Sequence, residues 1–231
     1  MKSLPAFILC LALLASAGCH SSPGSRTTAE PTPQPTESST GHHGRISSGA
    51  TAGVFDYYVF NLSWSPEFCD THPDSHECAS RPGFVVHGLW PQNNDGTYPE
   101  NCGNGATPNN PAAYLNLIPT VAMIEHEWQT HGVCSGLNPD DYFSDVRTAF
   151  QSVEIPATFA RSSLPPARVD PEVILNQFRQ DNPSFPRSSF VLTCGHNQLT
   201  AIEVCFNRKL EPQPCQGLHS CRARSITITP P

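Results

Sequence analysis

Eight cysteines between residues 69 and 221 limit the folds that are open to this chain. They follow a leader that holds two further cysteines, so the remaining number is even. In an exported protein, an even set of this kind is typical of a disulfide framework. We therefore expect four disulfides, although spacing alone leaves about 105 pairings open. The eight residues are Cys69, Cys78, Cys102, Cys134, Cys194, Cys205, Cys215 and Cys221.

The leader, residues 1–19, has the composition of an export signal. Lys2 precedes an apolar run from Ala6 to Ala15, which is too short to span a bilayer permanently. Small residues follow, so cleavage can occur after Ala17, or before Cys19 if that cysteine receives a lipid anchor. We expect an exported protein that is periplasmic, secreted or anchored to the envelope as a lipoprotein.

Residues 20–50 have a different composition from the rest of the chain. Ser, Thr, Pro or Gly occupies 20 of these 31 positions, so the segment cannot bury enough apolar surface to offset its chain entropy. We expect a disordered tether there, followed by one folded domain over residues 51–231. No later run reaches 18 apolar residues, so no second membrane segment is expected.

Strand patterns lie at both ends of this domain. Residues 55–62 alternate apolar side chains on two faces and are rich in aromatic and β-branched residues, as expected for a central strand buried on both sides. Further strands are predicted at 83–89, 189–194, 199–206 and 225–229.

Three helix starts lie between these strands, each a capping residue followed by proline. They are Asn110-Pro111, Asn138-Pro139 and Asp170-Pro171. We expect the first helix to break at Pro119 and to resume as far as about Thr130. Strands at both ends and helices in the middle predict an α+β fold, with helices packed on a central, mainly antiparallel sheet.

Two segments concentrate residues that can exchange protons near neutral pH. The first, FVVHGLWP, contains His87, and the second, HEWQTHGVC, contains His126, Glu127 and His131. A single histidine is more often a structural hydrogen-bonding residue, but three of them with a carboxylate favour a functional site. On a helix the last three residues span an arc of about 140°, so they can share one pocket.

The same residues raise the alternative of a metal site. The zinc-protease motif H-E-x-x-H separates its histidines by four positions, whereas His126 and His131 lie five apart. The eight cysteines are needed for disulfides and are not expected to bind a metal. We therefore favour a site that transfers protons without a metal.

Together the two segments resemble the active-site motifs of the ribonuclease T2 family, F-x-x-H-G-L-W-P and H-E-W-x-K-H-G-T-C. The resemblance extends over most of residues 57–221, including YYVFNLSWSPEFC and LTAIEVC. It implies a ribonuclease T2-like α+β fold and an endoribonuclease that cleaves RNA, but not DNA, through a 2′,3′-cyclic phosphate. No cofactor is implied, and we expect a monomer.

The resemblance also implies a role for each member of the site. His131 would remove the proton of the ribose 2′-hydroxyl, and His87 would protonate the leaving 5′-oxygen. His126 would bind the phosphate, while Glu127 would polarise it or orient a histidine.

Base binding is implied for two aromatic residues. Trp90 and Tyr98 would form a slot in which bases stack, and such stacking tolerates all four bases. The alternative for Trp90 is packing in the core. Gln92 stands where some family members place an Asp that contacts the base, so base preference is open.

The resemblance, together with the short spacings, implies one pairing of the cysteines. The pairs are Cys69–Cys78, Cys102–Cys134, Cys194–Cys221 and Cys205–Cys215.

Two features depart from the family pattern. Thr130 occupies the place of a lysine, and the candidates for a substitute cation are Arg81, Arg147 and Arg161. Residues 51–231 also hold 10 Lys or Arg against 18 Asp or Glu, a balance of −8 that does not favour polyanion capture. These features motivate the alternative of a catalytically weak RNA-binding or toxin-like protein that retains the fold.

One short motif finds no place in this interpretation. Asn61-Leu62-Ser63 matches a glycosylation acceptor, but it lies within a predicted strand. We interpret the match as accidental.

Overall fold

The computed structural model describes residues 44–47, 49–80, 82–103, 105–159 and 167–231. The expected signal peptide, including Cys19, and most of the expected tether lie outside these residues. Strands and helices combine in the described part as an α+β fold, which confirms the predicted class. None of the helices described is long and apolar enough to cross a membrane.

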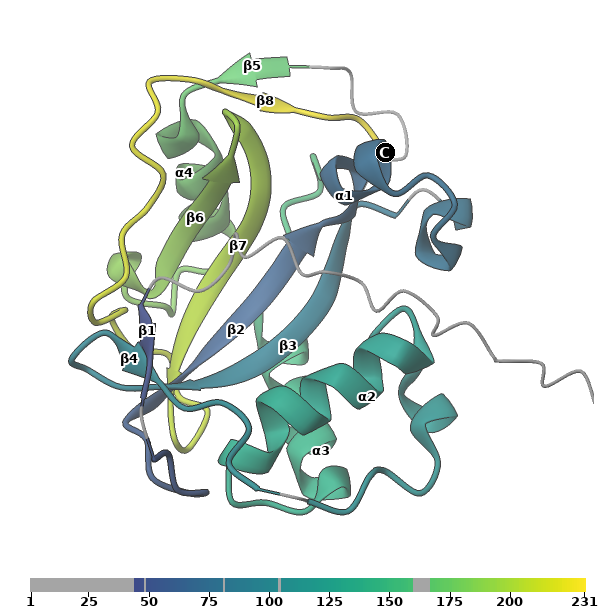
Figure 1. Cartoon of the computed structure of the whole chain (residues 1–231). Helices are drawn as coiled ribbons and strands as arrows, with labels where there is room; N and C mark the ends of the chain where they lie inside the picture. Colours follow the sequence, from purple (N-terminus) through teal and green to yellow (C-terminus); the bar gives the residue numbers. More distant parts are fainter. Residues whose placement is uncertain (1–43, 48, 81, 104, 160–166) are drawn as a thin grey trace, which may run out of the picture. The chain divides into compact units, whose positions relative to one another are not determined.

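The main sheet has six strands, which include all five predicted ones. They are β2 (Tyr57–Trp64), β3 (Phe84–Gln92), β5 (Ala167–Val169), β6 (Phe190–Gly195), β7 (Gln198–Asn207) and β8 (Ile226–Ile228). The order is β3-β2-β7-β8-β5, and β6 pairs with β7 (Figure 1). Only β7 and β8 pair in parallel, so the sheet is mainly antiparallel as predicted.

Strand β2 lies between β3 and β7 and is buried on both faces. Phe60 and Leu62 point into the main hydrophobic core, whereas Tyr57 and Val59 pack with Trp90 on the opposite face. Successive side chains of a strand point to opposite faces, so the alternation in the sequence translates directly into two apolar surfaces.

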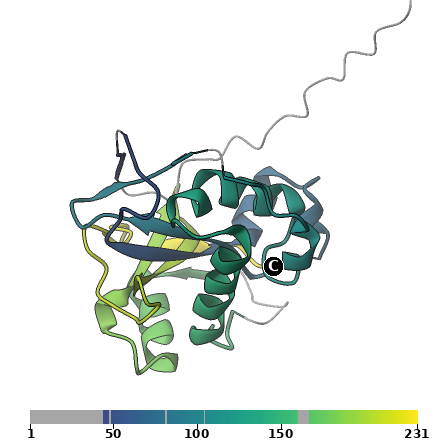
Figure 2. The ribbon, with the colours of Figure 1, turned by 90° about the horizontal axis from the view of Figure 1, so that it is seen from below.

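Helices α3 (Pro139–Ser152) and α4 (Pro171–Asp181) begin where the sequence predicts. The side chains of Asn138 and Asp170 accept hydrogen bonds from backbone N–H groups in the first turn of each helix. Their apolar residues join the core formed by the sheet, and Figure 2 shows both helices on the same side of the strands. The two capping predictions are therefore confirmed.

The predicted start of the first helix is wrong. The side chain of Asn110 makes no cap, and Pro111–Tyr114 forms only a short 3-10 helix, η2. Helix α2 spans Val121–Thr130 and is capped by the Thr120 side chain. The break at Pro119 and the end at Thr130 agree with the prediction.

Several short elements were not predicted. Arg45–Ile46, inside the expected tether, forms β1, which pairs in parallel with β4 at Thr97–Tyr98. Paired structure therefore extends before residue 51, the predicted start of the domain. The other unpredicted elements, besides β5, are α1 (Ser65–Thr71), η1 (His76–Ser80), η3 (Gly132–Cys134) and η4 (Arg187–Ser189).

Four disulfides cross-link the part of the chain that the structure describes. They join Cys69 to Cys78, Cys102 to Cys134, Cys194 to Cys221 and Cys205 to Cys215. These are the pairs that the family resemblance implied. The second one ties the loop after β4 to the chain that follows α2.

Candidate active site

His87 projects from an irregularity in the pairing of β2 with β3. Asn61 lies opposite Gly88, whereas the next residue of β2, Leu62, lies opposite Val86. His87 is thus the extra residue of a β-bulge, a feature that re-aims a side chain out of the regular alternation. Its side chain is 23% exposed, so the ring is open to a substrate.

Glu127, on α2, is completely buried and faces two residues of β3. Its Oε1 lies 3.2 Å from Nε2 of His87, and its Oε2 accepts a hydrogen bond from Nε1 of Trp90 at 2.8 Å. A buried carboxylate is strongly disfavoured unless polar partners compensate for the lost water. These partners therefore hold the carboxylate beside His87.

Gly88 provides the space that this carboxylate occupies. A Cβ atom at position 88 would overlap the carboxylate of Glu127 and lie 2.7 Å from Nε1 of Trp90. Only glycine leaves room for both groups. The first histidine segment contains Gly88, but this steric role was not predicted for it.

His126 and His131 lie at the C-terminal end of α2. The backbone N–H of His131 donates to the carbonyl of Glu127, and the His131 ring centre lies 6.4 Å from that of His126. The centre of the Trp90 ring system lies 5.3 Å from that of His131 and 5.3 Å from that of His87. The structure thus brings His87, Glu127 and His131 together around Trp90, and His126 lies beside His131.

The chain after α2 holds this helix end in place. Helix η3 packs so closely that a Cβ atom at Gly132 would lie 2.5 Å from the ring of Trp128. Cys134, at the end of η3, is bonded to Cys102. The backbone beside His131 is therefore fixed by both packing and a covalent link.

The contacts of Trp90 place it at the inner wall of the site. It is 2% exposed, and it packs with Tyr57 and Val59 as well as with the catalytic candidates. Tyr98, on β4, and Gln92, at the end of β3, are buried too. Base stacking on Trp90 and Tyr98 remains a prediction.

Thr130 lies beside the histidine that is expected to bind phosphate. Its hydroxyl oxygen is 3.5 Å from Nδ1 of His126. Of the candidate cations, Arg147 donates a hydrogen bond to a neighbouring asparagine, and Arg81 and Arg161 lie outside the described residues. Arg147 is therefore the one candidate cation that falls within the described residues, and its guanidinium is hydrogen-bonded to Asn116.

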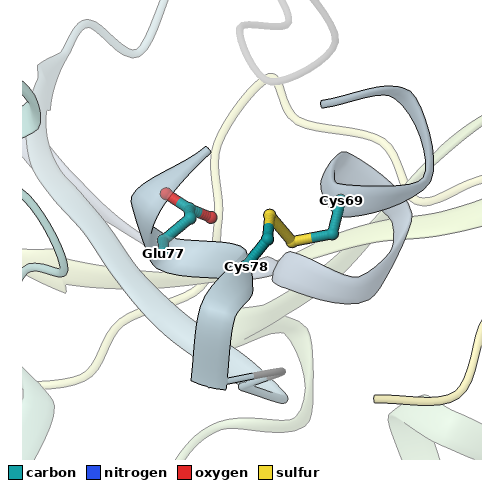
Figure 3. Close-up of side chains that lie close together, drawn as sticks. All are labelled: Cys69, Glu77 and Cys78. Atoms are coloured by element: carbon teal, nitrogen blue, oxygen red, sulfur yellow. A yellow bond between two sulfur atoms is a disulfide. The ribbon is translucent and has the colours of Figure 1, made fainter. Parts of the chain in front are cut away.

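One cluster with the spacing of a metal site lies away from these residues. It consists of Cys69, Glu77 and Cys78. Figure 3 shows that the two sulfur atoms are bonded to each other, and Glu77 accepts a hydrogen bond from Ser65. Because the cysteines are oxidised, they offer no thiolate to a metal.

A second cluster with metal-site spacing coincides with the candidate site. One ligand atom from each of His126, Glu127 and His131 falls within 4.8 Å of the others. Two imidazoles and a carboxylate are also a donor set that zinc accepts. The geometry is compatible both with proton transfer without a metal and with zinc binding. Activity measured with and without a chelator separates these two alternatives.

Comparison with known protein families identifies the chain. Residues 55–215 match the ribonuclease T2 family. This match covers more than half of the sequence and includes both histidine segments. The chain belongs to the ribonuclease T2 family.

Individual relatives are ribonucleases. A ribonuclease from Aeromonas hydrophila is 42% identical over 107 residues, which cover 44% of this chain and 49% of that protein. A probable ribonuclease from Haemophilus influenzae is 29% identical over 192 residues, which cover 74% of this chain and 65% of that protein. The chain therefore spans between about half and two thirds of the length of these relatives.

Solved structures show the same fold. An RNase-related protein from Calystegia sepium has a TM-score of 0.62 at 24% identity, covering 76% of this chain and 97% of its own. RNase NT in complex with 5′-AMP has a TM-score of 0.58 at 20% identity, and the match covers 77% of this chain and 98% of that structure. The ribonuclease T2-like fold implied by the sequence is thereby confirmed.

Proposed function

We propose that this chain is an exported endoribonuclease that cleaves single-stranded RNA by general acid/base transphosphorylation without a metal. The observation that carries the proposal is the cluster of His87, Glu127 and His131 around Trp90 in a member of the ribonuclease T2 family. One structural neighbour, RNase NT, binds 5′-AMP, which supports a nucleotide ligand.

The reaction needs one base and one acid. His131 removes the proton of the ribose 2′-hydroxyl, and the 2′-oxygen attacks phosphorus. The bond from phosphorus to the 5′-oxygen breaks, and His87 supplies the proton that this oxygen takes up. The products are a 2′,3′-cyclic phosphate and a 5′-hydroxyl. DNA has no 2′-hydroxyl and is not cleaved.

His126 and Glu127 assist these two histidines. His126 contacts the phosphoryl oxygens, where negative charge grows during the attack. Glu127 orients His87, since its Oε1 lies 3.2 Å from Nε2 of that ring. At acidic pH the imidazoles gain positive charge, which eases RNA binding to an otherwise acidic domain.

Export is part of the proposal. Four disulfides support an oxidising compartment, because cytosolic reductants keep thiols reduced. The protein acts as a monomer, either free in the periplasm or medium or anchored through Cys19.

The test is cleavage by the purified exported protein of matched single-stranded RNA and DNA at several pH values, with and without a chelator. We expect RNA alone to be cleaved, to cyclic phosphate ends, with no effect of the chelator. Binding of RNA without cleavage would support the alternative of a catalytically weak RNA-binding or toxin-like protein. Activity lost to the chelator and restored by zinc would show a metal-dependent hydrolase.

A further inference from the structure

Two polar residues on β2 lie beside His87, on a strand face whose other β2 residues are apolar. Asn61 and Ser63 are two positions apart, so they share the face on which Tyr57 and Val59 lie. Asn61 is 1% exposed. This burial supports the interpretation of Asn61-Leu62-Ser63 as an accidental glycosylation match. A buried amide on a central strand still needs hydrogen-bond partners.

Ser63 connects this amide to the proposed acid. The hydroxyl of Ser63 donates to Oδ1 of Asn61 at 3.0 Å. Oγ of Ser63 also lies 2.8 Å from Nδ1 of His87. A serine hydroxyl has one proton to donate and lone pairs to accept with. Because that proton goes to Asn61, Ser63 accepts a hydrogen bond from His87, and Nδ1 carries a proton.

The other nitrogen of the ring faces the opposite way. Nε2 of His87 points to α2, where Oε1 of Glu127 lies 3.2 Å away. Groups from three elements contact the ring: Ser63 on β2, Glu127 on α2 and the Trp90 indole on β3. Nε2 is the nitrogen on the side of the other catalytic candidates.

A buried carboxyl group lies behind the amide. Glu203 of β7 is opposite Asn61 in the sheet, and burial raises its pKa from 4.5 to about 8, an effect that hydrogen bonding from Asn61 reduces. The amide thus turns its NH2 group to Glu203 and its oxygen to Ser63.

We propose that Ser63 and Asn61 are positioning residues that keep the proton on Nδ1 of His87 and reserve Nε2 for the acid step. This proposal rests on the proposed ribonuclease function. In the step, the Nε2–H bond breaks and a bond from hydrogen to the 5′-oxygen forms. The electron pair stays on Nε2, and Nδ1 keeps its proton throughout.

Two substrates separate the acid step from the rest of the reaction. A dinucleoside monophosphate has a poor leaving oxygen that needs a proton, whereas a nucleoside 3′-(4-nitrophenyl phosphate) has a leaving group that departs without one. We expect Ser63→Ala to lower kcat for the dinucleoside about tenfold, the size expected for one lost hydrogen bond to a charged group. The nitrophenyl substrate should be cleaved at the wild-type rate.

The histidine variants provide the reference pattern. His87→Ala should lose the dinucleoside reaction and keep the nitrophenyl reaction, whereas His131→Ala should lose both. If the wild-type protein cleaves neither substrate, the proposed function itself is wrong. If the histidine variants behave as expected but Ser63→Ala affects both substrates equally, or neither, only the positioning role is overturned.

Further variants guard against a folding defect in Ser63→Ala. Asn61→Ala frees the hydroxyl proton of Ser63 and should also slow only the dinucleoside reaction. Ser63→Thr keeps a hydroxyl group, so it should retain the dinucleoside activity that Ser63→Ala loses. Thr200→Val is the matched control, since it removes a hydroxyl that pairs with Thr193 elsewhere in the same sheet. In ¹⁵N NMR spectra, the share of neutral His87 that is in the Nδ1–H tautomer should be larger in wild type than in Asn61→Ala. An unchanged tautomer and unchanged rates in Asn61→Ala would contradict the proposal.

Discussion

The indole N–H of Trp90 donates to Oε2 of Glu127 at 2.8 Å, and this bond joins strand β3 to helix α2 inside the site. It gives Trp90 a role that differs from the base stacking implied by resemblance, because the bond holds the carboxylate that faces His87.

Trp90→Phe separates the two roles. Phenylalanine keeps an aromatic face for stacking but has no N–H group, so the buried carboxylate loses a donor. We expect kcat for RNA to fall about tenfold or more, with KM changed little. A raised KM at unchanged kcat would instead assign Trp90 to base binding.

Removal of either proposed proton-transfer residue should nearly abolish RNA cleavage. We expect His87→Ala and His131→Ala each to cost roughly 10²–10⁴ in kcat, because acid and base act in the same step. His219→Ala is the matched control, since this exposed histidine lies in the segment before β8. Circular dichroism should show that all three variants fold. Wild-type activity in a folded His87 or His131 variant would remove that residue from the mechanism.

The disulfide between Cys102 and Cys134 should stabilise the fold and the site. Replacing both cysteines with alanine should lower the free energy of unfolding by about 2–5 kcal/mol. The pair Cys69 and Cys78 is the control, because it closes 9 residues rather than 32 and lies away from α2. Denaturant unfolding measures both losses. A larger loss of activity in the control pair would contradict the anchoring role.

Thr130→Lys should make the enzyme faster. An ammonium group near His126 would stabilise the negative charge that grows on the phosphoryl oxygens, a type of contribution that typically changes rates by ~10²–10³. We expect kcat to rise more than KM falls, and we expect the rise to be larger at neutral than at acidic pH, because a histidine of ordinary pKa carries less positive charge there. Steady-state kinetics at acidic and neutral pH are the measurement. No gain at either pH would mean that another cation already has this role.

Glu203 should make stability depend on pH. Because burial raises its pKa from 4.5 to about 8, the folded protein holds a proton that the unfolded chain releases between these values. This contribution to stability is complete below about pH 4.5 and is lost as the pH rises towards 8. Glu203→Gln keeps the shape of the side chain and stays neutral. Near pH 8 its free energy of unfolding should therefore exceed that of wild type by on the order of a few kcal/mol. If the free energy of unfolding changes with pH in the same way in both proteins, Glu203 is not the source of the pH dependence.

Much of the fold could be predicted from local patterns. The alternation that became β2 and the capping residues Asn138 and Asp170 act over a few neighbouring positions, so the sequence by itself specifies them. The same holds for His126, Glu127 and His131, whose spacing along α2 and its C-terminal cap is a local property. The two histidine segments are also specific enough to indicate the family, because each combines its reactive residues with a fixed set of neighbours.

Tertiary structure decided how these segments act on one another. The bulge at His87 depends on the register between β2 and β3, and the bond from Trp90 to Glu127 depends on where α2 packs. Likewise, Ser63 meets His87 only because the two strands are neighbours. Register and packing are set by contacts between residues far apart in the chain. The local propensity of a segment depends only on its own residues and therefore does not determine these contacts.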